Sequence, residues 1–236
     1  MTIKIAVIEF PGSNCDLDTL HVINNVIGID ADLVWHNRFN GDKYDGAILP
    51  GGFSFGDYLR SGIIAAHSPA IEETQKMLED NKPIIGICNG FQILAEAELL
   101  PGALLQNTSL KFICKWVNIK VENTQTAFTT RMNKGDVLDI PIAHGEGRFF
   151  TDKLEELKEN DQIVFKYCTR KGDITEESNP NGSMENIAGV CNLERNCLGL
   201  MPHPERTSEE ILSPYKTTHG KLFFESMVDF IKNGGV

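Results

Sequence analysis

The sequence KPIIGICNGFQILAEA, residues 82–97, joins a short apolar run to a segment whose apolar residues recur at helical spacing. Residues 82–87 have the composition of a buried strand, and Phe91, Ile93, Leu94 and Ala97 predict one apolar face of a helix. Cys88 therefore falls on a turn that leads from a strand into a helix.

Cys88 lies between Gly86 and Gly90, in the pattern of a nucleophile elbow with sulfur in place of the serine oxygen. A residue on such a turn has a strained backbone, so its neighbours must be small enough to pass close to it. The free N–H groups of the helix that follows stabilise a thiolate. Most free cysteines are small buried hydrophobes, but the strand before Cys88 and the helix after it favour a reactive thiol.

The composition excludes several classes of protein. A chain of 236 residues can bury a substantial core, and we expect a single domain over residues 1–236. Because it has 33 acidic and 22 basic residues, its net charge of −11 disfavours nucleic acid and favours a small-molecule or protein partner. We find no signal peptide or membrane-length apolar run, so we expect no membrane association and a cytoplasmic location. The six cysteines form no C-x-x-C pair, so we expect neither disulfides nor a bound metal.

The order of the predicted elements favours an α/β fold. Strand-like and helical runs alternate through the first half, which predicts a parallel sheet with helices on both faces. These runs are Ile3 to Phe10, Cys15 to Ile27, Asp32 to Trp35, Gly46 to Leu49, Pro69 to Leu78 and Ile84 to Cys88. The second half has mostly strand-like runs, which we interpret as an antiparallel extension of the same sheet. These are Phe112 to Val121, Val137 to Ala143, Ile163 to Cys168, Ile187 to Asn192 and Leu198 to Met201. A helix over Lys221 to Lys232 closes the chain, and the polar stretch from Lys171 to Glu185 is the best candidate for a mobile loop.

A thiolate nucleophile needs a base or acid that is oriented by a third group. Two histidines have a carboxylate two residues away, and the pairs are His203 with Glu205 and His144 with Glu146. Prolines on both sides of His203 exclude a helix and hold the segment extended, which puts residues two apart on the same side. The His144 pair lies between glycines, where no fixed geometry is implied. We therefore favour His203 and Glu205 as the partners of Cys88.

The loop Pro50 to Asp57 follows directly on a predicted strand and is rich in glycine. Glycines such as Gly51 and Gly52 let backbone N–H groups point at a developing negative charge, and the loss of one such donor costs about 3–4 kcal/mol. The Asn89 N–H, just after the nucleophile, is the natural second donor. A tight turn without function and a phosphate cradle are the alternatives, and the glycine spacing disfavours the second.

Taken together, residues 50–52 (PGG), 86–92 (GICNGFQ) and 203–205 (HPE) resemble the class I, triad-type glutamine amidotransferases. Two further stretches, residues 10–16 (FPGSNCD) and 144–149 (HGEGRF), look like the glutaminase subunits of phosphoribosylformylglycinamidine synthase, an enzyme of purine biosynthesis. The similarity spans essentially the whole chain.

The resemblance implies a flavodoxin-like α/β amidotransferase domain that hydrolyses L-glutamine to glutamate and ammonia. Cys88 would be the nucleophile, His203 the acid and base, and Glu205 its orienting group. The other expected substrate-binding residues are Gly51, Gly52, Asn89, Gln92 and His144. The N–H groups of Gly52 and Asn89 would hold the oxyanion, Gln92 would help shape the glutamine pocket, and the loop from His144 to Phe149 would face the pocket or the synthetase. The ammonia would pass to a synthetase subunit that uses ATP and Mg²⁺, joined by a small third subunit, and this chain itself would need no cofactor.

Other functions are compatible with parts of the pattern. Another triad amidotransferase, serving GMP, CTP, carbamoyl phosphate or anthranilate synthesis, would share the three motifs but not residues 10–16 and 144–149. A cysteine peptidase or stress protein of the same fold also places a cysteine on an elbow, but His203 and Glu205 far downstream disfavour it. A non-catalytic binding module is disfavoured by the intact set of Cys88, His203 and Glu205.

Overall fold

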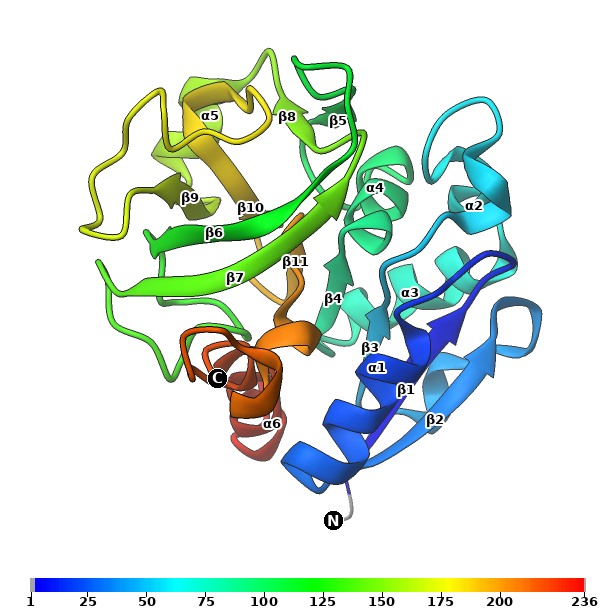
Figure 1. The fold of residues 1–236 in the computed structure, drawn as a ribbon. Coiled ribbons are helices and arrows are strands. Elements are labelled where there is room, and N and C mark those ends of the chain that lie inside the picture. Colours follow the sequence, from blue (N-terminus) through cyan, green and yellow to red (C-terminus); the bar gives the residue numbers. More distant parts are fainter. Residues whose placement is uncertain (1–2, 236) are drawn as a thin grey trace.

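The computed structural model describes residues 3–235 and contains one large sheet of nine strands and one small sheet of two (Figure 1). The strand order of the large sheet is β2-β1-β3-β4-β11-β10-β9-β6-β7. The first five strands in this order run parallel to one another, and every pair from β11 to β7 is antiparallel. The predicted parallel sheet with an antiparallel extension is confirmed.

The parallel half is built from short, apolar strands. Their bounds are β1 (Lys4–Glu9), β2 (Asp30–Trp35), β3 (Gly46–Leu49), β4 (Ile84–Ile87) and β11 (Cys197–Leu200). Every residue of β3, β4 and β11 is buried, as expected for strands with both faces covered. One detail of the prediction is wrong, because the run assigned to the antiparallel extension at residues 198–201 forms β11, which pairs in parallel with β4.

The antiparallel half follows the predicted runs closely. Its strands are β6 (Ile113–Val121), β7 (Val137–His144), β9 (Ile163–Cys168) and β10 (Ile187–Cys191). The small sheet pairs β5 (Ala103–Leu105) with β8 (Arg148–Phe150) and was not predicted, since three-residue strands carry too little pattern.

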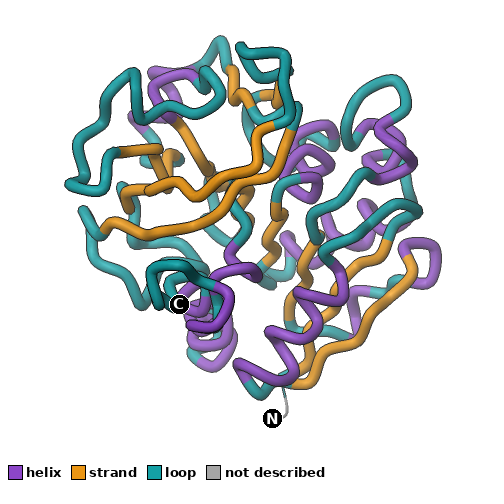
Figure 2. Tube along the Cα trace, viewed as in Figure 1, coloured by secondary structure: helices purple, strands orange, loops and turns teal. Residues whose placement is uncertain are grey.

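Helices cover both faces of the parallel half (Figures 1 and 2). α1 (Asp16–His21), the π-helical turn η1 (Val22–Ile27) and α6 (Lys221–Lys232) lie on one face. α3 (Pro69–Glu79) and α4 (Asn89–Glu96) lie on the other, beside the short α2 (Ile63–Ala66). The remaining α-helix, α5 (Leu154–Glu159), was not predicted, because only Leu157 of its six residues is buried. None of the helices in residues 3–235 has the length and apolar character needed to cross a membrane.

The antiparallel half curls over the carboxyl end of β4. Four strands separate β4 from β7 in the sheet order, yet the Ala143 carbonyl of β7 accepts a hydrogen bond from the Cys88 thiol at 3.7 Å. The backbone N–H of His203, just after β11, donates to Pro141 of β7 at 2.9 Å. Figure 1 shows β6 and β7 crossing in front of β10 and β11. This curl places the end of β7 beside the predicted nucleophile.

The polar stretch Lys171 to Glu185, predicted as a loop, contains no strand or α-helix. Its second half is anchored by side-chain amides, because Asn179 Nδ2 donates to the Ser183 carbonyl at 2.7 Å and Asn181 Nδ2 donates to the Gly147 carbonyl at 2.7 Å. Asn186, directly after it, donates to the Tyr167 carbonyl at 3.1 Å. The loop therefore supports the turn that follows β7.

The contact between α4 and β3 leaves no room for a side chain at Gly90, where a Cβ would overlap the Leu49 carbonyl oxygen. We expect Gly90→Ala to lower the free energy of unfolding by roughly 3 kcal/mol, because the helix must shift away from the sheet. Urea unfolding of the two proteins measures the difference. Gly145→Ala is the matched control, since a Cβ there would meet nothing closer than 3.8 Å. Equal loss of stability in the two variants would contradict the explanation.

Candidate active site

Cys88 stands between β4 and α4 with φ 51° and ψ −103°, a conformation that L-residues rarely adopt. Its backbone N–H donates to the Leu200 carbonyl at 2.8 Å, and its side chain is 5 % exposed. A Cβ on Gly86 would lie 2.6 Å from the Gly90 carbonyl carbon and oxygen, so the two glycines pass too closely for larger residues. The predicted strained turn between a strand and a helix is present.

His203 and Glu205 form a buried pair beside this turn. Nδ1 of His203 donates to Glu205 Oε1 at 2.6 Å, and the two residues are 2 % and 1 % exposed. Burial lowers the pKa of His203, but Glu205 and the thiols of Cys88 and Cys15 outweigh it and hold that pKa well above its ordinary value. Nε2 of His203 has no hydrogen-bond partner within residues 3–235, so it is free to exchange a proton.

The extended segment predicted around His203 is present only in part. His203 itself has φ −106° and ψ 89°, but Pro204–Thr207 form a 3-10 turn with proline at its first position. The turn brings the Glu205 carboxylate back onto Nδ1 of His203, so the pairing occurs by a tighter geometry than the one expected.

The glycine loop after β3 is tied to the elbow by the Asn89 side chain. Ser54 N–H donates to Asn89 Oδ1 at 3.0 Å, and Asn89 Nδ2 donates to Gln92 Oε1 at 2.9 Å. Gly52 has φ 158°, and a Cβ there would lie 2.7 Å from the Ser13 Cα, so only glycine fits. Gly51 is packed differently, because a Cβ there would lie 2.7 Å from His203 Cε1. Gly51 therefore makes room for the imidazole.

His144 is buried at the end of β7 but does not pair with Glu146. Its Nδ1 lies 3.1 Å from Asn107 Oδ1, while Glu146 Oε2 accepts from the Ser61 N–H at 3.4 Å. Because an amide oxygen can only accept, Nδ1 of His144 carries the proton, and its Nε2 has no partner among the described residues. Burial and the nearby His203 lower the pKa of His144 to about 4, so the ring is neutral at pH 7.

Gln92 is 6 % exposed and spans two parts of the site. Its Oε1 accepts from Asn89, and its Nε2 donates to the Glu146 carbonyl at 2.6 Å. The side chain thus braces the turn after β7 against the start of α4.

Four neighbours of the site were not singled out in the sequence. Cys15 Sγ lies 3.9 Å from His203 Nδ1, and Arg206 Nη2 donates to that sulfur at 3.1 Å. Asn107 orients His144, and Tyr167 is fully buried with its pKa raised by burial and by the nearby Cys88. Cys15 lay inside residues 10–16 and Arg206 directly follows Glu205, but only the fold reveals their contacts.

Cys15, His203 and Glu205 offer three ligand atoms within 4.8 Å of one another, close enough to hold a metal ion. The guanidinium of Arg206 lies 3.1 Å from the sulfur and 3.8 Å from Glu205 Oε1, where its charge opposes a second cation. We therefore interpret the group as a hydrogen-bonded cluster.

Comparisons with known proteins identify the family of this chain. Residues 2–231 match the model of the CobB/CobQ-like glutamine amidotransferase domain. The chain is 53 % identical to phosphoribosylformylglycinamidine synthase subunit PurQ of Methanosarcina acetivorans, over 97 % of this chain and 98 % of that protein. It is also 53 % identical to the PurQ subunit of Methanocaldococcus jannaschii, over 97 % and 99 %. The chain belongs to the PurQ family of glutamine amidotransferases.

A solved structure of PurLQS from Thermotoga maritima extends the likeness to three dimensions. It matches 98 % of this amidotransferase and 100 % of its own chain, with a TM-score of 0.86 and 44 % sequence identity. The resemblance stated from the motifs is confirmed, and so are the fold class and the assignment as an amidotransferase.

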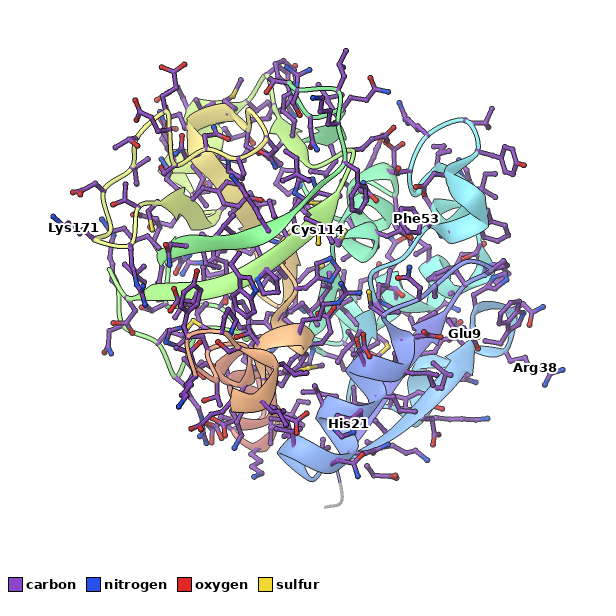
Figure 3. All side chains as sticks on the ribbon, in the orientation of Figure 1. Glu9, His21, Arg38, Phe53, Cys114 and Lys171 are labelled. Carbon is purple, nitrogen blue, oxygen red and sulfur yellow. The ribbon has the colours of Figure 1, made fainter. Side chains whose placement is uncertain are left out.

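Two exposed aromatic side chains of this amidotransferase, Phe53 and Phe112, lie close together. Figure 3 shows Phe53 and Cys114 near the junction of the two halves of the sheet and Lys171 at the outer edge of the antiparallel half. Phe53 is 44 % exposed and Phe112 54 %, and their ring centroids are 6.4 Å apart. The loop after β3 and the start of β6 therefore present an aromatic pair to solvent.

The lowered pKa of His144 predicts an acid-sensitive fold. Its folded-state pKa of about 4 lies below the unfolded value, so the unfolded chain binds more protons as the pH falls. Stability should therefore be lost between roughly pH 6.5 and 4, by up to ~3 kcal/mol from this residue. His144→Gln should reduce that loss, which urea unfolding at a series of pH values measures. The control His67→Gln, at an exposed histidine, should leave the pH dependence unchanged. A wild-type pH dependence in His144→Gln would contradict the assignment.

Proposed function

We propose that this chain is the glutaminase subunit of a phosphoribosylformylglycinamidine synthase, with Cys88, His203 and Glu205 as its catalytic triad. The observation that carries the proposal is the buried pair of His203 and Glu205, 2.6 Å apart, beside a cysteine held at φ 51° ahead of a helix. A buried acid–base pair next to a strained thiol is the arrangement that acyl transfer requires.

The reaction begins with proton transfer from the Cys88 thiol to Nε2 of His203. The thiolate then attacks the side-chain amide carbon of glutamine, and the oxyanion accepts hydrogen bonds from the N–H groups of Gly52 and Asn89. The His203 imidazolium gives its proton to the amide nitrogen as the carbon–nitrogen bond breaks, which releases ammonia and leaves a thioester. His203 next takes a proton from water, and the hydroxide attacks the thioester carbon. As the carbon–sulfur bond breaks and glutamate is released, the His203 imidazolium returns that proton to the Cys88 sulfur. The raised pKa of His203 supports its role as the acid.

The remaining predicted binding residues act around the amide. Nε2 of His144 is neutral and unpartnered within residues 3–235, so it is suited to accept a hydrogen bond from the substrate. Gln92 acts through its hydrogen bonds to Asn89 and to the Glu146 carbonyl, which hold the pocket wall in place. Gly51 acts by admitting the His203 ring.

Ammonia from this site passes to a synthetase subunit that uses ATP and Mg²⁺, and a small third subunit completes the complex. Support comes from the relatives, which are named as subunits of the synthase, and from the PurLQS structure. The exposed Phe53 and Phe112, with Tyr58 and Leu59 at 75 % and 90 % exposed, supply an apolar surface for such a partner. All six cysteines are free thiols, which fits a reducing cytoplasm.

Treatment with a glutamine-mimicking alkylator tests the nucleophile. We expect a single adduct on Cys88, mapped by mass spectrometry, and protection by added glutamine. Cys114 is the exposed cysteine and serves as an internal control, because a non-specific reagent such as iodoacetamide should modify it. Glutamine-protected labelling of any cysteine other than Cys88 would overturn the mechanism.

Replacement of the nucleophile tests the division of labour. In the complex reconstituted with its synthetase, Cys88→Ala should reduce glutamine-dependent synthesis by at least ~10³-fold, since the covalent step is lost. Synthesis from added ammonium salt should stay within about twofold of wild type, because that reaction bypasses Cys88. Loss of both activities would mean that Cys88 is needed for structure or assembly.

A further inference from the structure

A second cysteine lies against the ring of His203, on the side opposite its free nitrogen. Cys15, at the start of α1, is 1 % exposed, and its sulfur is 3.9 Å from Nδ1 of His203. Nε2, the atom that exchanges protons with Cys88 in the proposed reaction, is at the other end of the same ring. Cys15 is therefore placed to influence His203 without touching the substrate.

The hydrogen bonds of Cys15 define the state of its sulfur. Sγ donates to Asn14 Oδ1 at 3.2 Å and accepts from Arg206 Nη2 at 3.1 Å. Burial raises the pKa of Cys15, so the residue remains a neutral thiol at pH 7. A neutral thiol whose proton points at Asn14 presents its lone pairs to Arg206 and toward the Nδ1 edge of His203, whose N–H donates to Glu205.

Arg206 links this sulfur to the carboxylate of the triad. Its Nε lies 3.8 Å from Glu205 Oε1 and 3.9 Å from Asp18 Oδ2. One guanidinium thus contacts both groups that lie at Nδ1 of His203, the Cys15 sulfur and the Glu205 carboxylate. The planar guanidinium of arginine has several N–H donors, so it suits such bridging better than the single ammonium group of a lysine.

Cys15 is also joined to the glycine loop. Its backbone N–H donates to the Gly51 carbonyl at 3.1 Å, and a Cβ on Gly51 would lie 3.1 Å from its sulfur. The imidazole of His203 is therefore enclosed by Gly51, Cys15 and Glu205, all packed at or near van der Waals contact.

We propose that Cys15 and Arg206 are positioning residues for His203. Together they fix the Nδ1 edge of the ring and the Glu205 carboxylate, so that Nε2 faces Cys88, and the Cys15 sulfur adds support for the charged imidazolium. Cys15 is not a second nucleophile, because it is a neutral, buried thiol on the far side of the ring. The inference rests on the proposed function, since it assigns a role within the same triad.

The test compares Cys15→Ala with Cys15→Ser in the reconstituted complex. We expect Cys15→Ala to lower kcat for glutamine by about 10- to 100-fold with little change in KM, because a misplaced ring affects the chemical step. The alkaline limb of the pH–rate profile should move to lower pH, since the imidazolium loses a neighbour that raises its pKa. Cys15→Ser keeps a lone pair at this position and should recover most of the rate and the profile. Arg206→Gln should change the rate in the same direction as Cys15→Ala.

Cys191→Ala is the matched control, because Cys191 is also fully buried but lies on β10. It should keep the wild-type pH profile, and all variants should keep ammonia-dependent synthesis. A wild-type rate and profile in Cys15→Ala would overturn the proposal, and so would the same shift in Cys191→Ala. If Cys15→Ala does not fold, Arg206→Gln decides, since a wild-type rate in that variant would also overturn the proposal. Cys88→Ala separates this result from the proposed function, because glutamine-dependent synthesis that persists in that variant would overturn the proposed function whatever the Cys15 variants show.

Discussion

The backbone of Cys88 is the constraint on which the rest of the site depends. A non-glycine residue at φ 51° and ψ −103° costs of order 1–3 kcal/mol, so the surrounding structure must hold it there. Gly86 and Gly90 allow β4 and α4 to meet at this point, and the Cys88 N–H is bound to the Leu200 carbonyl of β11. The strain is thus maintained by buried strands on one side and a buried helix on the other. Its result is a thiol that projects from the end of the sheet at the start of a helix.

The second constraint is the curl of the antiparallel half. The turn at Cys88 needs partners from distant parts of the chain. β7, the last strand in the sheet order, supplies two of these contacts. Its Ala143 carbonyl accepts from the Cys88 thiol, and its Pro141 carbonyl accepts from the His203 N–H. Without the curl, four strands would separate both carbonyls from β4. The antiparallel strands therefore serve as the wall of the site as well as an extension of the core.

Sequence patterns were sufficient for the long, regular elements. The strand Ile163–Cys168 and the helix Lys221–Lys232 were predicted to the residue, because their apolar periodicity extends over their whole length. α5 and the small sheet were missed, since short surface elements bury too few side chains to leave a pattern. The pairing of His203 with Glu205 was predictable, because only one residue separates them. The contacts of His144 with Asn107 and of Cys15 with Arg206 span 37 and 191 residues, and no local rule carries that information.

The two histidines of the site show how flanking residues decide what a carboxylate two positions away can do. Both occur in the pattern His-x-Glu, yet proline at 204 turns Glu205 onto Nδ1 of His203, and glycine at 145 lets Glu146 turn to the Ser61 N–H instead. His203 thereby gains an anion that outweighs burial, and its pKa rises. His144 has only the neutral amide of Asn107, so burial and the adjacent His203 lower its pKa to about 4. Neighbouring rings whose pKa values are shifted in opposite directions suit different tasks, since one can donate a proton to departing ammonia while the other offers a lone pair to an N–H.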